Sequence, residues 1–565
     1  MNAQAKKPVD VVYTDGEIIV SPTVPAAQAI FIQAGHVAAV GSNEEVILAA
    51  GESIPTVSLK GAVVIPGLID THSHLLHFTA FTGSLRDITK AKDHADILNA
   101  IRQDAKKKPK GSWIMLSPVG ELHWLHRRSH KDLEEGCLPD RYTLDIASTD
   151  HPVIIAALAP KCPNIVAFNS LALEVLGIGR DTPNRVNDVW VEKDDNGYPT
   201  GILRGQVSSY YNYDPFFAGI LRKMPNIIQP DLVPPAVTRA MKNYNGMGIT
   251  AIYEGHAMEF NQIEAYQTFC DHNLLSLRVK ACPELTPGSL PTDPVLTSDD
   301  VRANLERAAE IRQEKDDWLR ISGVTTCPLP VPMGEVTTGR RGVSQEHLEI
   351  AFDFCARRGL RLNLCSVSPD EHDDHLAMTE KMMDKHNLKR TGWILQHGML
   401  IRPDQIKKLA ELGFDMTVSS AFTYGSGDLF RERVGPECLQ QLNPFRQLLD
   451  AGLNVAASMD WGPINPFEQM QLAVTHEMYP SRRTNAGLQQ VVTRAEAFDM
   501  WTRQGAKVLG WEGIGELSPG SHADLAIVDR NPITCDLDSL PATRVLRTLV
   551  GGSVVHDDGS LPSVL

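Results

Sequence analysis

The 565-residue sequence has little positive charge and no long hydrophobic run. It contains 54 lysine and arginine residues against 69 aspartate and glutamate residues, which gives a formal net charge of −15 at pH 7. A nucleic-acid-binding surface needs clustered basic residues, so this composition argues against one. No uninterrupted apolar stretch approaches the ~20 residues that a transmembrane helix needs. We therefore expect neither a nucleic-acid nor a membrane partner.

Disulfide-type cysteine patterns and a secretory signal pattern are also missing. The nine cysteines are scattered and include no Cys-x-x-Cys pair, which is typical of a reducing compartment. The segment MNAQAKKPVDVVYTDGEIIV has no continuous apolar run and leads directly into a strand-like pattern. The sequence thus predicts a cytoplasmic protein, and we also expect a homo-oligomer, a dimer.

Short β-strand patterns occupy both ends of the chain. Runs rich in Val and Ile, separated by glycine turns, lie between Asp10 and Val64 and again in the last part of the sequence. Neither end alone has enough strands to bury a core. We therefore predict one small β-sandwich built from residues 1–62 and 509–565.

The middle of the chain alternates apolar runs with helical patterns such as SQEHLEIAFDFCARRG and RPDQIKKLAELG, each ending at a glycine suited to a left-handed cap. We interpret eight runs as strands: GAVVIPGLID, GITAIYEG, LSLRVKAC, LRISGVTTC, LRLNLCSV, GWILQHGM, FDMTVSSA and LNVAASMDW. This alternation predicts an α/β fold, a (β/α)8 barrel over residues 63–508. Because the first crossover is too long for one helix, we expect an inserted subdomain at about residues 80–248, with a hairpin in EKDDNGYPTGILRG.

Three strand ends carry residues that bind divalent metals. The first strand leads into His72 and His74, which share one face of an extended segment because alternate side chains do. His397 and Asp460 directly follow two other apolar runs. Each pattern alone is more often structural. In an α/β barrel, however, the reacting groups lie at the carboxyl ends of strands, so together these residues predict a metal site.

These motifs make the sequence similar to the amidohydrolase superfamily, specifically its amidohydrolase-3 branch. The resemblance rests on VIPGLIDTHSHL, GYPTGILRG, LAELGFDMTVSSAF, SMDWGPINPFEQ and GIGELSPGSHADLAIVDRNP, and it extends over nearly the whole chain. It implies a metal-dependent barrel hydrolase in which His72, His74 and Asp460 bind the metal. His397 matches the family's sixth-strand histidine. The resemblance also implies that Asp460 is catalytic, because that residue takes the proton of the attacking water.

The sequence departs from the family pattern at several positions. The fourth-strand region has Thr325, Thr326 and Cys327 where a carboxylated lysine or an acidic residue is common. Cys365 stands where a fifth-strand histidine is expected, and Gly205 stands in place of a glutamate. A standard binuclear centre is therefore compromised.

Several other residues are candidates for the missing ligands. Glu254 and His256 end the second predicted strand and offer a carboxylate and an imidazole. Cys365 has a thiol that suits zinc when ionised, although a free cysteine is more often simply buried. Lys280, on the third predicted strand, is the weakest candidate, as a displaced carboxylated lysine.

Two further segments contain histidines. His123 and Trp124, in ELHWLHRRSH of the insertion, are candidates to line the substrate pocket, although a helical surface segment explains them almost as well. His372 and His375 lie in the acidic segment DEHDDH, which we interpret as a solvated turn.

The resemblance implies hydrolysis of a C–N bond, of amide type and other than a peptide bond, in a small-molecule substrate. A divalent ion, which we expect to be zinc, would polarise the carbonyl and lower the pKa of a bound water towards ~7. Asp460 would pass the proton of that water to the leaving nitrogen. Branch members include deformylases of N-substituted formamides. The altered fourth and fifth strands leave a lyase, decarboxylase or isomerase as the alternative, and an inactive binding protein as a third interpretation.

We predict one tightly held divalent ion per chain. Two ions need a bridging anionic ligand to offset their repulsion, and the usual fourth-strand lysine and fifth-strand histidine are both absent. Inductively coupled plasma mass spectrometry on protein purified without chelator should find one equivalent per chain. Two equivalents, with loss of one on mutation of Glu254 or Lys280, would contradict this prediction.

Overall fold

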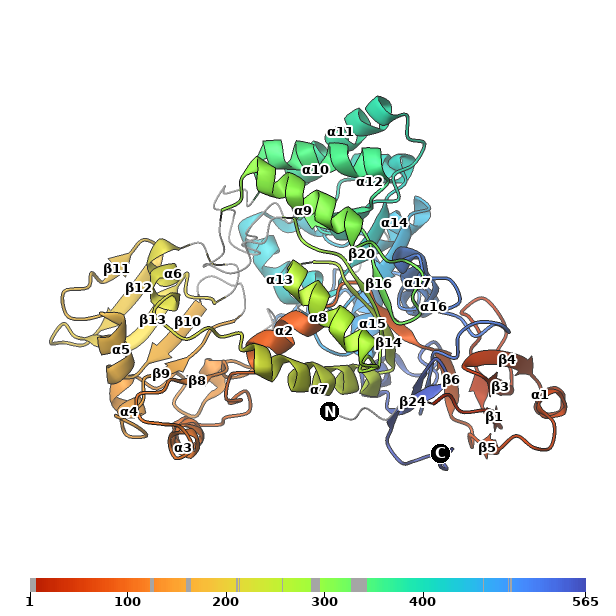
Figure 1. Ribbon diagram of the computed structural model, residues 1–565, viewed down its shortest axis with the longest axis horizontal. Helices are drawn as coiled ribbons and strands as arrows, with labels where there is room; N and C mark the ends of the chain where they lie inside the picture. Colours follow the sequence, from red (N-terminus) through yellow and green to blue (C-terminus); the bar gives the residue numbers. More distant parts are fainter. Residues whose placement is uncertain are drawn as a thin grey trace.

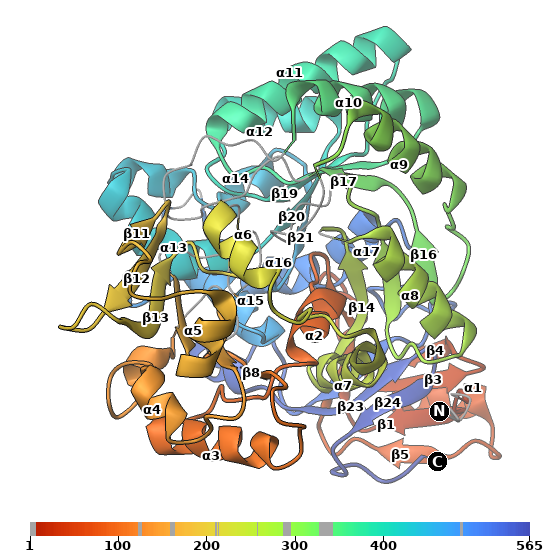
Figure 2. The same cartoon turned by 60° about the vertical axis from the view of Figure 1, so that its left-hand side comes forward.

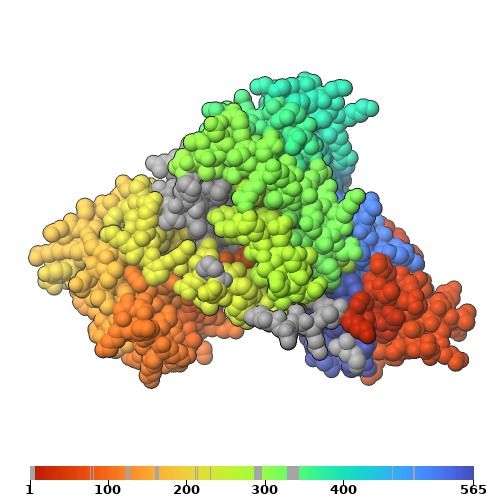
Figure 3. All heavy atoms as spheres, in the orientation of Figure 1, coloured from red at the N-terminus to blue at the C-terminus, as the bar shows by residue number. Residues whose placement is uncertain are grey.

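The computed structural model describes residues 7–121, 127–158, 164–209, 212, 214–256, 258–285, 295–326, 343–460, 462–485, 487 and 490–564. It is a mixed α/β protein in which the inserted segment forms a lobe on one side of a set of parallel strands, with the sheets of the chain ends on the other side (Figure 1). The surface is hollowed between this lobe and the green helices of the middle segment (Figure 3). No helix of the described part is both long and apolar enough to cross a membrane.

The strands in the middle of the chain run parallel to their neighbours and follow chain order. They form two sheets, and the eight predicted strands are all represented in them. The first sheet has the order β7 (Leu68–Asp70), β14 (Ile249–Glu254), β15 (Arg278–Ala281) and β16 (Leu319–Ile321). The second has the order β17 (Val324–Thr326), β18 (Leu362–Leu364), β19 (Ile394–His397), β20 (Asp415–Val418) and β21 (Asn454–Ala457).

Two of the predicted strands are interrupted at a glycine. The run over residues 61–70 divides at Gly67 into β6 (Val63–Pro66), which pairs with a strand from the end of the chain, and β7, which pairs with β14. A Cβ atom at residue 67 would overlap the side chain of Thr250, so this close approach requires glycine. The fourth run divides at Gly323, which has a φ of +84°, and its halves β16 and β17 belong to different sheets.

Hydrogen bonds join the two parallel sheets at both ends of the strand order. At one junction the segment after β15 pairs with β17: the amide of Thr325 donates to the carbonyl of Pro283 at 2.9 Å, and the amide of Leu285 donates to that of Thr325 at 3.0 Å. At the other, the amide and the hydroxyl of Thr71 donate to the carbonyl of Ala457 at 3.3 and 2.9 Å. The carboxyl ends of the first and last strands therefore lie side by side, although these two residues are 386 positions apart.

Helices cover the outer side of the parallel strands. They follow one another in an arc around the second sheet (Figure 2): α9 (Ser298–Glu310), α10 (Gln345–Arg358), α11 (Pro369–His386) and α12 (Pro403–Leu412). Helices α10 and α12 end at Gly359 and Gly413, both in the left-handed conformation, which confirms the predicted caps.

The segment DEHDDH is part of helix α11, so the prediction of a solvated turn was wrong. His372 and His375 are buried, with 1% and 2% of their surface exposed. Together with Leu376 and Thr379 they recur at intervals of three and four residues, which places them on one helix face. This helical periodicity is not visible as a pattern of apolar residues, because two of the buried positions are histidines.

The inserted segment contains a sheet of its own, with the strand order β11-β12-β13-β10-β9-β8. Strands β12 (Val189–Lys193) and β13 (Pro199–Gly205) pair antiparallel, which confirms the predicted hairpin. The other strands are β8 (Ile114–Leu116), β9 (Val153–Ile155), β10 (Asn164–Phe168) and β11 (Arg185–Val186), with helices α3 (His94–Ala105), α4 (Arg141–Asp145), α5 (Ser170–Leu176) and α6 (Pro215–Leu221) packed around them.

Strands from both ends of the chain form two further sheets. One has the order β4-β3-β1-β5 and the other the order β2-β6-β22-β23-β24. The first comprises β1 (Val11–Thr14), β3 (Ala29–Gln33), β4 (His36–Gly41) and β5 (Thr56–Ser58), and the second β2 (Glu17–Ile18), β6, β22 (Leu525–Val528), β23 (Val545–Val550) and β24 (Ser553–Asp557). Tyr13, Ile30, Leu525 and Leu549 belong to one apolar core that both sheets share. The two ends therefore fold together.

Three cationic side chains from the parallel strands bind the carboxyl end of helix α17 (Arg503–Leu509). Lys280 donates to the carbonyl of Leu509 at 2.7 Å, Arg320 donates to that of Gly510 at 3.4 Å, and Arg361 donates to that of Val508. The last carbonyls of a helix carry partial negative charge, so cations stabilise them. Burial lowers the pKa of Lys280 to about 7.

We predict a pH-dependent contribution of Lys280 to stability. Its pKa is about 7 in the folded chain against an ordinary value of 10.5. Between these values the unfolded chain binds the proton more tightly, so the unfolding free energy rises with pH in this window. In urea denaturation, wild type should gain stability relative to Lys280→Met as the pH is raised from 7 to 10. A difference between the two proteins that does not change with pH would contradict this assignment.

Candidate metal centre

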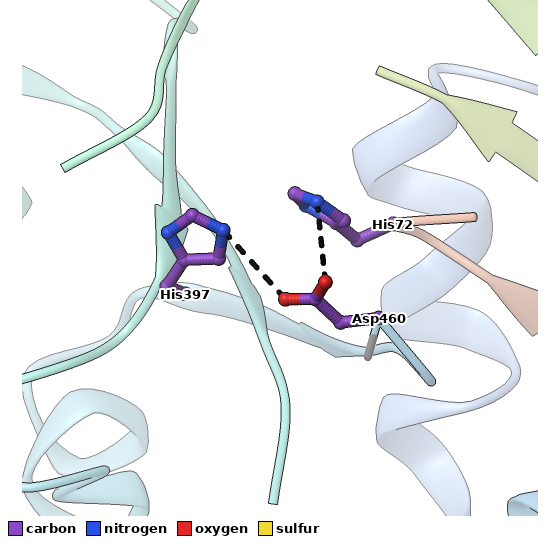
Figure 4. Close-up of side chains that lie close together, drawn as sticks. All are labelled: His72, His397 and Asp460. Atoms are coloured by element: carbon purple, nitrogen blue, oxygen red, sulfur yellow. Dashed lines mark ion pairs between the residues drawn. The ribbon is translucent and has the colours of Figure 1, made fainter. Parts of the chain in front are cut away.

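The four residues predicted from strand ends converge on one buried point. Asp460 Oδ1 lies 3.8 Å from His72 Nε2 and 3.4 Å from His74 Nε2, and Asp460 Oδ2 lies 3.6 Å from His397 Nε2. Figure 4 shows His72 and His397 on either side of the Asp460 carboxylate. The ring centroid of His72 is 5.1 Å from that of His74 and 5.0 Å from that of His397. The chain thus brings together three imidazoles and a carboxylate from three strand ends.

This donor set fits a divalent metal ion. Donor atoms that share one ion at ~2.1 Å lie about 3–4 Å apart, and an Asp460 oxygen lies within this range of each of the three imidazole nitrogens. The Nε2 atom of His72 is buried and has no hydrogen-bond partner in the described part of the chain. Burial lowers the pKa of His72 well below its ordinary value and that of His74 to about 3. Both imidazoles are therefore neutral at pH 7, which is the form that binds a metal.

Two of the four residues have strained backbones. His397 has a φ of +75° and Asp460 a φ of +47°, in the left-handed region that residues with a Cβ rarely adopt. Such conformations cost on the order of 1–3 kcal/mol each and persist where the surroundings enforce them. Both lie where the chain leaves a parallel strand, so the turns that present these two side chains are held by their neighbours.

Asp70 connects the segments that carry His72 and Asp460. Its Oδ1 atom accepts hydrogen bonds from the amide of His72 at 3.3 Å and from the amide of Met459 at 3.0 Å. Burial raises the pKa of this carboxyl to about 7. Sequence reasoning missed Asp70, although it stands in the same IDTHSH motif, because the interpretation considered only the spacing of the two histidines.

Glu254 supports the segment after His74 and is not part of the donor cluster. Its Oε1 atom accepts hydrogen bonds from the amide of Leu76 at 2.9 Å and from the hydroxyl of Tyr266 at 2.7 Å. These bonds hold the start of helix α2 (Leu75–Thr82). Burial raises the pKa of the Glu254 carboxyl to about 8.

His256 lies beside the cluster and is paired with a carboxylate. Its ring centroid is 5.5 Å from those of both His72 and His74, and its Nδ1 atom is 3.6 Å from Glu284 Oε2. Sequence reasoning missed Glu284. This residue follows strand β15 by three positions, so the strand-end signal that identified Asp460 could also have found it.

The other candidates are placed differently. Cys365 lies against the ring of His397, with its sulfur 3.8 Å from Nδ1 and 4.0 Å from Nε2. It is outside the group of His72, His397 and Asp460, whose donor atoms all lie within 4.8 Å of one another among the described residues. Lys280 is turned towards helix α17. The candidates His123 and Trp124, like Cys327, lie outside the described residues.

Both the sequence and the fold of this chain are similar to those of known proteins. A sequence model of the Amidohydrolase family matches residues 55–556. N-substituted formamide deformylase of Arthrobacter pascens is 25% identical over 549 residues, which cover 94% of this chain and 95% of that protein. An uncharacterized metal-dependent hydrolase from Pyrococcus horikoshii OT3 has a TM-score of 0.69 at 20% identity, covering 94% and 99% of the two chains. Atrazine chlorohydrolase TrzN from Arthrobacter aurescens TC1, complexed with zinc, has a TM-score of 0.51 at 16% identity, covering 97% and 95%.

We predict that His72 and His74 act as a unit. Each supplies one nitrogen to the same cluster, so His72→Ala and His74→Ala should each lower the bound metal strongly, and the double variant should be little worse than either. Metal content is measured by mass spectrometry after dialysis. The control is His272→Ala, at an exposed histidine that caps the carboxyl end of helix α8 (Phe260–Asp271). Mild losses that add in the double variant would identify the two histidines as structural.

Proposed function

We propose that this chain, which belongs to the amidohydrolase family, is an enzyme that hydrolyses C–N bonds other than peptide bonds in a metal-dependent reaction. The family membership predicted from the motifs is thus confirmed. One observation carries the proposal: His72, His74, His397 and Asp460, from three separate strand ends, converge on one buried point.

We infer that the two parallel sheets are parts of a single (β/α)8 barrel spanning residues 63–508. The uninterrupted chain order of the strands and the hydrogen bonds at both junctions support this inference. The insertion at residues 80–248 and a sandwich made of residues 1–62 and 509–565 complete the proposed domain organisation. In this arrangement the metal-binding residues lie at the carboxyl ends of the barrel strands, where barrel enzymes carry their active sites.

One divalent ion per chain, which we propose to be zinc, would be held by His72, His74, His397 and Asp460. Three imidazole nitrogens and a carboxylate are a donor set that suits zinc. When bound, such an ion supplies a Lewis acid for a carbonyl and lowers the pKa of a water molecule. The triazine-hydrolysing relative of similar fold was crystallised with zinc, which supports this choice.

Asp460 is the proposed proton carrier. Both of its carboxylate oxygens face the histidines, and the side chain is buried, with the residue 5% exposed. In this position it takes a proton from the attacking water and gives it to the nitrogen that leaves. The neutral imidazoles around it do not compete for that proton, because burial lowers the pKa of each of them.

The substrate class that we propose is an N-substituted formamide or a related small amide. The deformylase of Arthrobacter pascens is named for such substrates and is similar over nearly its whole length. Two aromatic rings flank the centre in this chain: Phe422 packs edge-on against His397 at 5.1 Å and Phe78 against His74 at 5.9 Å. These rings support an apolar substituent on the nitrogen. A pocket role for His123 and Trp124, a cytoplasmic location and a dimer remain predictions.

Hydrolysis in ¹⁸O-labelled water tests the proposed reaction. With a panel of N-alkyl and N-benzyl formamides, the protein should release the free amine and formate that contains one solvent ¹⁸O atom, as measured by mass spectrometry. Asp460→Asn should keep the circular dichroism of the wild type and lose ~10³-fold or more in kcat, because a ligand is weakened and the proton carrier is lost. Product without solvent oxygen would favour the lyase or isomerase alternative, and wild-type turnover by Asp460→Asn would exclude its assigned role.

A further inference from the structure

The turn that presents His397 is held by one buried amide. The chain leaves strand β19 with two consecutive left-handed residues, His397 at a φ of +75° and Gly398 at +65°. Both of their carbonyls accept hydrogen bonds from the side-chain nitrogen of Asn443, at 3.1 and 3.2 Å. The backbone amide of Asn443 also donates to the carbonyl of Gly398, at 3.2 Å.

The side chain of Asn443 has a fixed orientation. It is completely buried, and its Oδ1 atom accepts a hydrogen bond from the hydroxyl of Thr423 at 2.8 Å. Thr423 belongs to helix α13 (Ala421–Arg433). Because the carbonyl end of the amide faces a hydroxyl donor, its NH2 end faces the two backbone carbonyls.

The turn also packs closely against strand β20 (Asp415–Val418). Gly398 has no side chain, and a Cβ atom there would lie 2.6 Å from the Val418 side chain, so no larger residue fits between the turn and strand β20. The left-handed conformation of His397 is intrinsically unfavourable. The hydrogen bonds from Asn443 satisfy two buried carbonyls of the turn.

The conformation of the turn decides where the His397 ring lies. Its Nε2 atom is 3.6 Å from Asp460 Oδ2, while the ring packs edge-on against Phe422 and lies against the sulfur of Cys365. A shift of the 397–398 backbone moves the ring relative to Asp460. Residues that orient a metal ligand typically change metal affinity 10–100-fold when mutated.

We propose that Asn443 is a positioning residue for the metal ion: its side-chain amide holds the left-handed turn at His397 and Gly398, and thereby the His397 ligand, in place. This inference rests on the proposed metal site. Asn443 itself contacts neither the other ligands nor the reacting atoms in the described contacts, so it acts through His397. Thr423 acts one step further away, by orienting the amide.

The test compares metal binding by three variants. Asn443 has a φ of +52°, so Asn443→Gly removes the amide without adding backbone strain. Thr423→Val removes only the hydrogen bond that orients the amide. The matched control is Asn169→Ala in the inserted lobe, where a completely buried asparagine likewise donates to two backbone carbonyls, those of Ser148 and His151 at 3.1 and 2.9 Å.

Metal-free proteins are titrated with Zn²⁺ by calorimetry, and Co²⁺-loaded proteins are compared by their visible absorption. We expect the Kd for Zn²⁺ to rise at least 10-fold in Asn443→Gly and about 3-fold in Thr423→Val, with an altered Co²⁺ spectrum in Asn443→Gly. Asn169→Ala should lower thermal stability and leave both readouts at wild-type values. Circular dichroism of the metal-free proteins verifies folding, and Thr423→Val provides the measurement if Asn443→Gly does not fold.

The outcomes separate this inference from the proposed function. Wild-type Zn²⁺ affinity and an unchanged Co²⁺ spectrum in folded Asn443→Gly, or an equal loss in Asn169→Ala, would overturn the positioning role while leaving the metal site intact. If Asn443→Gly does not fold, unchanged Zn²⁺ affinity in Thr423→Val would overturn it as well. Absence of Zn²⁺ binding by the wild-type protein would overturn the proposed metal-dependent function and this inference with it.

Discussion

One carboxylate oxygen, Oδ1 of Asp70, accepts hydrogen bonds from the amides of His72 and Met459, and the metal centre depends on this contact. Parallel strands need long crossover connections, so the first and last strands of such a set are distant in sequence. His72 and Asp460 follow these two strands, and Asp70 binds the amide of His72 and that of Met459, the residue next to Asp460. The junction through Thr71 and Ala457 keeps the two strand ends together, and the centre forms where they meet.

The protein separates two kinds of polar groups along its parallel strands. At the carboxyl ends, burial keeps the imidazoles neutral and raises the pKa of Asp70 and Glu254 to about 7 and about 8, which limits the charge that is removed from water. Elsewhere on the strands, Lys280, Arg320 and Arg361 keep their polar ends on the carbonyls of helix α17.

The sequence predicted the parallel strands and the four clustered residues because both follow from local patterns. An apolar run followed by His or Asp is visible in one dimension, and the carboxyl ends of parallel strands meet in space. Other features depend on partners that such a pattern does not contain. The run 61–70 divides because its two halves pair with different strands. Asn443 donates to the carbonyl of His397, which is 46 positions away. The helix at DEHDDH was missed because its buried positions are polar.

Strand β6 links the start of the parallel strands to the end of the chain. It is separated from β7 by Gly67 alone, and it pairs with β22, which contains Leu525. During synthesis on the ribosome, strand β6 can pair with β2 early, but its pairing with β22 has to wait until most of the polypeptide has been translated. Until then it exposes an unpaired edge, which is a site where nascent chains associate incorrectly. The order of translation thus makes the junction next to the metal ligands one of the last parts of the protein to be completed.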